Sequence, residues 1–166
     1  MADTWVANAS PLIILAHIGY IDLLHKIPDR LVIPRTVADE VFSGPPGDPA
    51  IEALVSGGFE ILDAPQPPPS LIAWDLGKGE TAVLSMAIAN PGWVSILDDK
   101  AARKFAQSYS LPVKGTLAVV INARQREIIP SAGALIQRMT HAGFWLDESF
   151  ICDVLAKSVE EIWPPE

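Results

Sequence analysis

The stretch that decides the fold is Trp93-Val94-Ser95-Ile96-Leu97-Asp98-Asp99-Lys100-Ala101-Ala102-Arg103-Lys104-Phe105-Ala106. Its apolar residues 93–97 predict a buried strand, and the residues after the two aspartates have the apolar spacing of an amphipathic helix. In open α/β sheets, ligands bind beyond the carboxyl ends of parallel strands. Two adjacent acids at such a position repel each other unless a cation or hydrogen-bond donors lie between them. The stretch therefore predicts a parallel sheet with a hard-metal site at its edge.

Strands and helices are predicted to alternate along the rest of the chain. The apolar runs predict strands at 5–7, 31–33, 59–62, 93–97 and 111–114, with 59–62 at an edge of the sheet. Helical spacing is found at 10–16, 21–24, 36–42, 51–55, 80–89, 102–109, 116–124, 131–141 and 147–157. This order favours an α/β fold in which a parallel sheet is covered on both faces. The proline-rich stretches 44–49 and 65–69 are expected to be loops within one domain, residues 1–160, followed by a tail at 161–166.

Composition limits the class of protein. The chain has 166 residues, of which 49% are hydrophobic, enough for one ordinary core. The first residues do not have the basic and apolar regions of a signal peptide, and no run approaches the ~20 apolar residues that span a bilayer. Cys152 is the single cysteine, so an internal disulfide is excluded. We therefore expect a cytoplasmic protein that does not contact membranes.

Charge is distributed unevenly. The net charge of −8 argues against a protein that coats nucleic acid in general. Residues 78–138, however, contain eight basic and four acidic residues, a balance of +4 around the acidic pair. This segment is either a surface for a negatively charged partner or a set of ordinary solvated helix faces.

Oxygen-bearing side chains follow several of the predicted strands or begin the helices next to them. They are Asn8, Glu40, Glu80, the pair Asp98-Asp99, and Thr116. Because loops after parallel strands gather at one edge of the sheet, these side chains are expected to converge. Oxygen ligands suit Mg²⁺ or Mn²⁺ rather than zinc, and the three histidines have no chelating spacing.

The same motifs, in this order, resemble a PIN-domain protein. They are Asn-Ala-Ser-Pro-Leu-Ile-Ile-Leu-Ala (8–16), Val-Ile-Pro-Arg-Thr-Val-Ala-Asp-Glu-Val (32–41), Gly-Lys-Gly-Glu-Thr-Ala-Val-Leu-Ser-Met-Ala (77–87), Leu-Asp-Asp-Lys-Ala-Ala-Arg (97–103) and Val-Lys-Gly-Thr-Leu (113–117). The resemblance covers about residues 5–157. It is strongest to the prokaryotic subgroup that is catalogued as a domain of unknown function and is related to VapC toxins.

The resemblance implies a three-layer α/β/α fold and a metal-dependent ribonuclease site. The acidic positions of the family correspond to Glu40, Glu80 and Asp99, with Asp98 as an additional or alternative ligand. Thr116 supplies a hydroxyl that orients water or metal. The first family position is usually aspartate and is Asn8 in this chain, so one negative charge is missing, a change that the subgroup tolerates.

From these residues we derive a hypothesis for the chemistry. One or two Mg²⁺ or Mn²⁺ ions neutralise the phosphate oxygens and lower the pKa of the attacking water. The metal ligands are expected among Asn8, Glu40, Glu80, Asp98 and Asp99, and the catalytic residues among the same acids and Thr116. Phosphate contacts are expected from Lys100, Arg103, Lys104 and Lys114. Single-stranded RNA is the expected substrate, because a compact cleft admits a splayed strand better than a duplex.

The expected partners beyond RNA follow from the same resemblance and from two tryptophans. A VapC-like protein implies an antitoxin as partner and a toxin–antitoxin pair as its setting. Trp145 and Trp163 are candidates for a homodimer or partner surface.

Alternatives remain open for the site and for the function. Asp98 or Asn8 is also a good helix cap, Glu80 suits the start of a helix, Glu40 suits a solvated helix face, and Gly115-Thr116 suits a turn. A degenerate PIN fold would bind RNA or a protein partner without catalysis. A phosphoryl-handling domain of the receiver or phosphatase type also uses an Asp-Asp pair, but it requires an aspartate nucleophile after the first strand, where this chain has asparagine.

Overall fold

The computed structural model describes residues 2–166. Five strands form one sheet in the order β3-β2-β1-β4-β5, and every neighbouring pair is parallel. The strands are β1 (Thr4–Ala7), β2 (Arg30–Pro34), β3 (Glu60–Leu62), β4 (Val94–Ile96) and β5 (Val113–Lys114). The α/β class with a parallel sheet is thus confirmed, and β3 lies at an edge as predicted.

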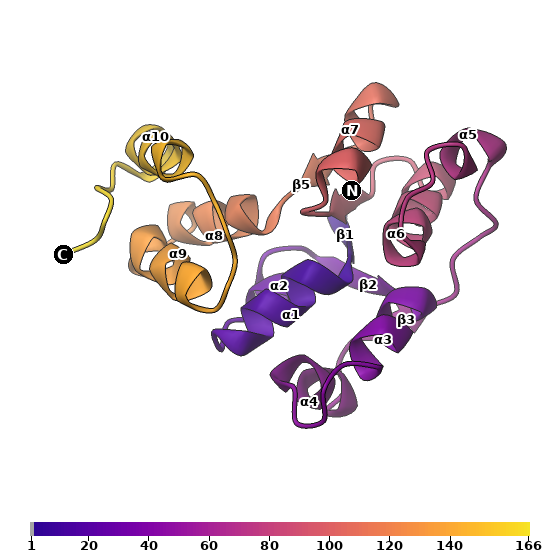
Figure 1. The fold of residues 1–166 in the computed structure, drawn as a ribbon, viewed down its shortest axis with the longest axis horizontal. Helices are drawn as coiled ribbons and strands as arrows, with labels where there is room; N and C mark the ends of the chain where they lie inside the picture. Colours follow the sequence, from indigo (N-terminus) through magenta and orange to yellow (C-terminus); the bar gives the residue numbers. More distant parts are fainter. Residues whose placement is uncertain (1) are drawn as a thin grey trace.

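Helices surround the sheet (Figure 1). They are α1 (Ala9–His17), α2 (Leu23–Lys26), α3 (Arg35–Phe42), α4 (Pro49–Val55), α5 (Pro69–Ile72), α6 (Lys78–Ala89), α7 (Lys100–Ser108), α8 (Thr116–Gln125), α9 (Ala132–His141) and α10 (Glu148–Val159). Figure 1 shows α5 and α6 at one end of the longest axis and α8, α9 and α10 at the other. Within residues 2–166, no helix is both long enough and apolar enough to cross a membrane.

The central strand β1 is buried along its whole length. Trp5, Val6 and Ala7 have no exposed surface, and Val32 and Ile33 on the neighbouring strand are equally buried. A parallel strand with helices on both faces has no side exposed to solvent, so its residues are continuously apolar instead of alternating between apolar and polar. This explains why the short apolar runs identified the strands.

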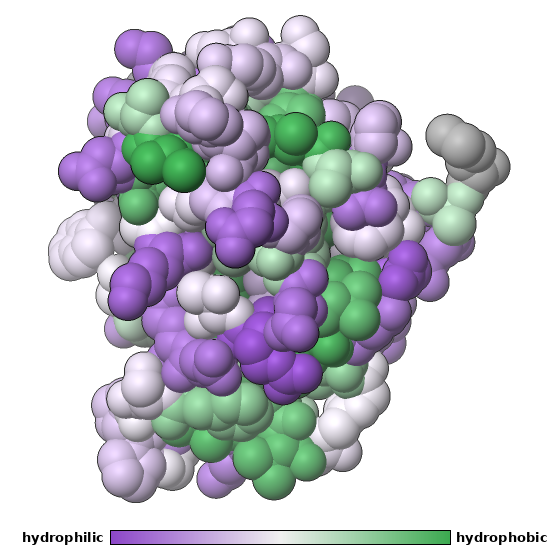
Figure 2. Space-filling view, turned by 90° about the vertical axis from the view of Figure 1, so that its right-hand side faces the viewer, coloured by the Kyte–Doolittle hydropathy of each residue, from purple (hydrophilic) through white to green (hydrophobic). Residues whose placement is uncertain are grey.

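One short helix departs from the prediction. The stretch 65–69 was expected to be a loop, but its last proline begins α5. Proline is well suited to the first turn of a helix, because its missing N–H would have no partner there. Leu71, which is fully buried, attaches this turn to the core. Figure 2 shows the side of the molecule with α5 and α6, where separate hydrophobic patches are surrounded by hydrophilic residues.

The register of the sheet brings the ends of three strands together. Ala7 pairs with Ile96, and Ile96 pairs with Lys114. The ladder continues past the strands, because Asn8 N–H donates to the Ile96 carbonyl (3.1 Å) and Leu97 N–H donates to the Lys114 carbonyl (2.9 Å). β1 has β2 on one side and β4 on the other, so this edge contains the topological switch point where α/β sheets bind ligands.

Candidate metal centre

Asn8 is the buried polar residue at the end of β1. Its side chain is 3% exposed. Although Asn8 occupies the N-cap position of α1, its side chain makes no capping hydrogen bond, so the capping interpretation of Asn8 is wrong. The amide Nδ2 instead donates to Glu80 Oε1 at 3.2 Å. The carbonyl Oδ1 is buried and has no hydrogen-bond partner among the described residues. An unpaired buried acceptor of this kind is rare and costs about 1–3 kcal/mol.

Two glycines bring the carboxylates of Glu40 and Glu80 close to Asn8. Glu80 lies in the first turn of α6, and its carboxylate folds back over Gly77 so closely that a Cβ there would overlap it. A Cβ on Gly79 would lie 2.7 Å from Glu40 Oε2 and 2.8 Å from Asn8 Oδ1. Both oxygens are thus within 2.8 Å of one point. The motif Gly-Lys-Gly-Glu therefore allows side chains from β1, α3 and α6 to converge.

The ionisation of Glu40 reflects this crowding. Partial removal of its carboxyl group from water raises the pKa of Glu40, and the negative charge of Glu80 raises it further. Both effects disfavour the charged form. A bound cation would reverse the second effect, so the structure holds two acids in an arrangement that a cation would relieve.

Asp98 is fixed where β1, β4 and β5 end. Its Oδ1 accepts from Thr116 N–H (2.8 Å), and its Oδ2 accepts from the hydroxyls of Thr116 and Ser10 (3.0 Å for Ser10). Thr116 is fully buried, so this carboxylate is held from the inside of the protein. The structure therefore brings Asp98 and Thr116 together, as the sequence predicted, and adds Ser10 as a partner that the sequence reasoning missed.

Asp99 has a different structural role from Asp98. It is the N-cap of α7, and its Oδ2 accepts from Ala102 N–H at 2.9 Å. The helix cap that the sequence suggested for Asp98 is thus provided by its neighbour. Of the two adjacent aspartates, Asp98 is the one that joins the strand ends.

The basic residues near the site fall into two groups. The guanidinium of Arg103 lies over Gly115, where a Cβ would overlap Nη1 and would lie 3.1 Å from Asp98 Oδ1. Lys114 is half-buried, with Nζ 5.3 Å from the centre of the Trp5 ring. Lys100 and Lys104 are exposed on α7. Arg103 is thus next to Asp98 and Lys114 lies against Trp5, whereas the two α7 lysines face solvent.

Residues 4–160 match the family described as DUF3368: PIN domain. The chain belongs to this PIN-domain family. PIN domains are generally nucleases, typically metal-dependent ones. A search of curated proteins finds no match. The family membership covers nearly the whole chain, and the five-stranded parallel sheet agrees with it.

The donor set of this PIN domain fits a hard divalent cation. Within residues 2–166, no three Asp, Glu, His or Cys side chains lie close enough together to hold an ion by themselves. Asn8 Oδ1, the buried atom without a partner, supplies the third oxygen beside Glu40 and Glu80. Carboxylate and amide oxygens are the ligands that Mg²⁺ and Mn²⁺ prefer. Asn8 thus places a neutral oxygen at the end of β1 beside the two carboxylates.

A surface pocket gives access to these oxygens. It has a volume of about 340 Å³ and is lined by residues that include Asn8, Ser10, Glu40, Glu80 and Phe144. We call it the carboxylate pocket. The pocket is open to solvent, and the mostly buried Asn8 is part of its lining.

Proposed function

We propose that this PIN domain is a Mg²⁺- or Mn²⁺-dependent endoribonuclease that hydrolyses phosphodiester bonds of single-stranded RNA. The observation that carries the proposal is the buried, unpaired Asn8 Oδ1 beside Glu40 and Glu80 at the switch point of a PIN-family sheet. A buried acceptor without a donor is accounted for if a cation is its partner.

The roles of the residues follow from their positions. Asn8, Glu40 and Glu80 hold the cation. Asp98 is held in place by three hydrogen bonds from Ser10 and Thr116 and adds a further carboxylate beside them. When bound, Mg²⁺ or Mn²⁺ neutralises charge on the phosphate and lowers the pKa of a water molecule.

The phosphate requires positive charge as well, since the pocket itself is acidic. Arg103 is half-buried beside Asp98 and can place its guanidinium against a phosphate that lies at the carboxylates. Lys114 adds a second positive charge at the end of β5. Single-stranded RNA fits better than a duplex, because a splayed strand can place one phosphate in a compact pocket.

The test is cleavage of a mixed-sequence single-stranded RNA by the purified protein in Mn²⁺ or Mg²⁺, with EDTA as the metal-free control. We expect Glu80→Gln and Asp98→Asn each to lower the rate by about 10–100-fold or more. Asp99→Asn is the matched control: asparagine caps helices as well as aspartate does, so we expect near-normal cleavage and stability.

Two results would contradict the proposal in different ways. Loss of cleavage in Asp99→Asn with normal cleavage in Asp98→Asn would exchange the roles of the two aspartates. A folded wild-type protein that binds RNA but does not cleave it in either metal would favour the alternative, a catalytically degenerate PIN module.

The proposal extends to the cell, where an unrestrained ribonuclease of this kind acts as the toxin of a toxin–antitoxin pair. We expect induced expression of the wild-type chain alone to arrest bacterial growth. Glu80→Gln, expressed to the same level, is expected to leave growth unchanged. Equal growth in the two cultures would argue against the toxin role without bearing on the cleavage assay.

A further inference from the structure

A second pocket lies between α8 and α10, next to the carboxylate pocket. Its volume is about 530 Å³, which is within the range of sites for small ligands. We call it the α8/α10 pocket. Its apolar lining comes from α8, from the segment before α10 and from α10 itself, and it includes Leu117, Ile121, Phe144, Trp145, Phe150 and Val154.

Aromatic side chains of this pocket are exposed to an unusual degree. Trp145 is 87% exposed and Phe150 is 51% exposed. A single exposed apolar residue on a surface needs no explanation. Here, however, both residues line one cavity, and Phe144 lies beside them. An aromatic ring that the core does not bury can offer its face to another flat ring.

Polar groups lie at defined positions of the same pocket. Asp98, Arg103 and Lys114 line its inner end, and the amides of Asn122 and Gln125 line its α8 side. Gln125 Nε2 donates to the Ser158 carbonyl at 3.2 Å, which fixes the amide between α8 and α10. Among the described residues, no ion pair or hydrogen bond occupies the Arg103 guanidinium. The pocket thus combines aromatic faces, amide edges and an available positive charge.

The α8/α10 pocket adjoins the carboxylate pocket. Phe144 lines both. Asp98 lines the α8/α10 pocket and accepts a hydrogen bond from Ser10, which lines the carboxylate pocket. The two pockets are therefore neighbours on the surface, as two sites for successive units of one extended ligand would be.

We propose that the α8/α10 pocket binds an unpaired base of the RNA strand, while a neighbouring phosphate of that strand contacts Arg103. This inference rests on the proposed function, because it takes the strand to be the substrate of the carboxylate site. Stacking on aromatic rings and hydrogen bonding to base edges are how proteins hold single-stranded RNA. An apolar peptide in the same pocket would leave the Arg103 guanidinium and the Asn122 amide without partners, which disfavours a protein ligand.

The first experiment measures binding without cleavage. The probe is a labelled single-stranded RNA of about eight nucleotides, titrated in EDTA and followed by fluorescence anisotropy. We expect Trp145→Ala and Arg103→Gln each to raise the Kd by about 10-fold. Because Trp145 is mostly exposed, its replacement is not expected to affect folding. An RNA of the same length without bases should bind the wild type and Trp145→Ala equally.

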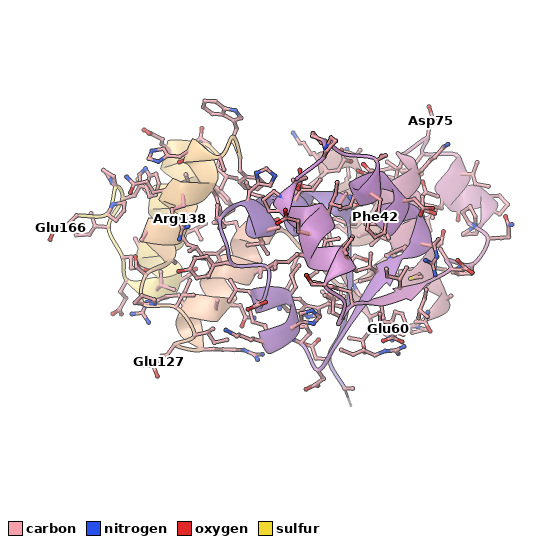
Figure 3. All side chains as sticks on the ribbon, turned by 90° about the horizontal axis from the view of Figure 1, so that it is seen from below. Phe42, Glu60, Asp75, Glu127, Arg138 and Glu166 are labelled. Carbon is pink, nitrogen blue, oxygen red and sulfur yellow. The ribbon has the colours of Figure 1, made fainter. Side chains whose placement is uncertain are left out.

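Phe42→Ala is the matched control. Phe42 is an aromatic residue of α3 that is 41% exposed. It lies away from the α8–α10 end of the molecule, which is marked by Arg138 and Glu166 in Figure 3. We expect its Kd to equal that of the wild type. In addition, RNA that contains 4-thiouridine should cross-link to residues 144–150 on irradiation.

Several outcomes would overturn the inference. One is an unchanged Kd in Trp145→Ala, together with cross-links that map outside the pocket. Another is a wild-type dimer in sedimentation that Trp145→Ala converts to monomer with RNA binding intact, because the pocket would then be a protein interface. Normal metal-dependent cleavage in either case would leave the proposed function standing. Conversely, pocket-dependent binding without any cleavage would remove the proposed function alone.

Discussion

Replacing Asn8 by aspartate places a third carboxylate beside Glu40 and Glu80, and its cost can be calculated from one contact. Asn8 Nδ2 lies 3.2 Å from Glu80 Oε1. Two carboxylates at that separation repel each other by about 5 kcal/mol at an effective dielectric constant of about 20. A shared proton relieves this repulsion and replaces the lost donor.

The free energy of keeping one of the two carboxyl groups protonated sets the upper limit of the destabilisation. Keeping an aspartate with an unperturbed pKa of about 3.9 protonated costs about 4 kcal/mol at pH 7 and about 1.5 kcal/mol at pH 5. We therefore expect metal-free Asn8→Asp to be about 4 kcal/mol less stable than the wild type at pH 7, or about 10 °C lower in Tm. At pH 5 the difference should shrink to about 1.5 kcal/mol.

The assay is thermal unfolding in EDTA and in Mn²⁺ at both pH values. A cation that removes the repulsion recovers the same free energy, so its affinity for Asn8→Asp should be up to about 1,000-fold higher than for the wild type. Asn90→Asp is the control, because it loses a hydrogen bond of 2.9 Å to the Met86 carbonyl and adds the same charge at the far end of α6. Equal Tm values for Asn8→Asp and the wild type in EDTA at pH 7 would refute the assignment of Asn8 as a cation ligand beside Glu80. The absence of extra stabilisation by Mn²⁺ would refute it as well.

The remaining predictions concern Glu40, Gly79 and Glu161. Because the pKa of Glu40 is raised, the wild type loses stability as the pH rises through that pKa. Glu40→Gln should therefore melt about 1 °C higher than the wild type in EDTA at pH 7. Below about pH 4, where Glu40 is protonated, the two Tm values should become equal. Gly79→Ala should weaken Mn²⁺ binding in calorimetry, because its Cβ displaces Glu40 and Asn8; unchanged Mn²⁺ binding would contradict this. Because Asn8 is buried, this displacement should also offset the stability that alanine adds to the helix, so Tm should not rise. Burial raises the pKa of Glu161, but hydrogen bonds from Ser131, Ala132 and Gly133 and the charge of Arg124 outweigh burial and lower it overall. Glu161→Gln should therefore lose about 1–2 kcal/mol at pH 7, measured by urea unfolding, and this difference should disappear as the pH falls through the lowered pKa; a difference that persists at low pH would contradict the charge-based explanation.

The parallel sheet could be predicted because its strands are buried on both faces. Trp5-Val6-Ala7 and Leu31-Val32-Ile33 are short apolar runs between helical patterns. Few folds other than a parallel sheet covered by helices have this pattern. The helix α5 could not be predicted in the same way. Its four residues are too few for a periodic pattern, and its start at Pro69 resembles the proline-rich loop before it.

The candidate site could be predicted by residue type but not by orientation. Asp98 and Asp99 have the same side chain, and only the direction of the backbone decides which one caps α7 and which one meets Thr116. The spacing does not help, because Asp98 lies three residues before Ala101 just as Asp99 lies three before Ala102. The roles of Ser10 and Gly79 depend on contacts across the sheet, for which a single sequence has no pattern.

The hydrogen bonds that the Glu161 carboxylate accepts could not be predicted from local sequence either. Its carboxylate accepts from Ser131 Oγ at 2.6 Å and from Ala132 N–H at 2.9 Å, thirty and twenty-nine residues away in the chain. A glutamate just after a helix is common, so the sequence gives no signal of this role. Only the fold shows that it serves the start of another helix, α9.

The strand order has a consequence for the synthesis of the protein on the ribosome. β1 is made first, yet it pairs with β4, and Ser10 contacts Asp98, which is made 88 residues later. Until that segment leaves the ribosome, Ser10 has no carboxylate to donate to and the edge of β1 that faces β4 stays open. Asp98 then gains its second partner only when Thr116 follows. The carboxylate pocket, whose lining runs from Asn8 to Phe144, is therefore complete only near the end of synthesis.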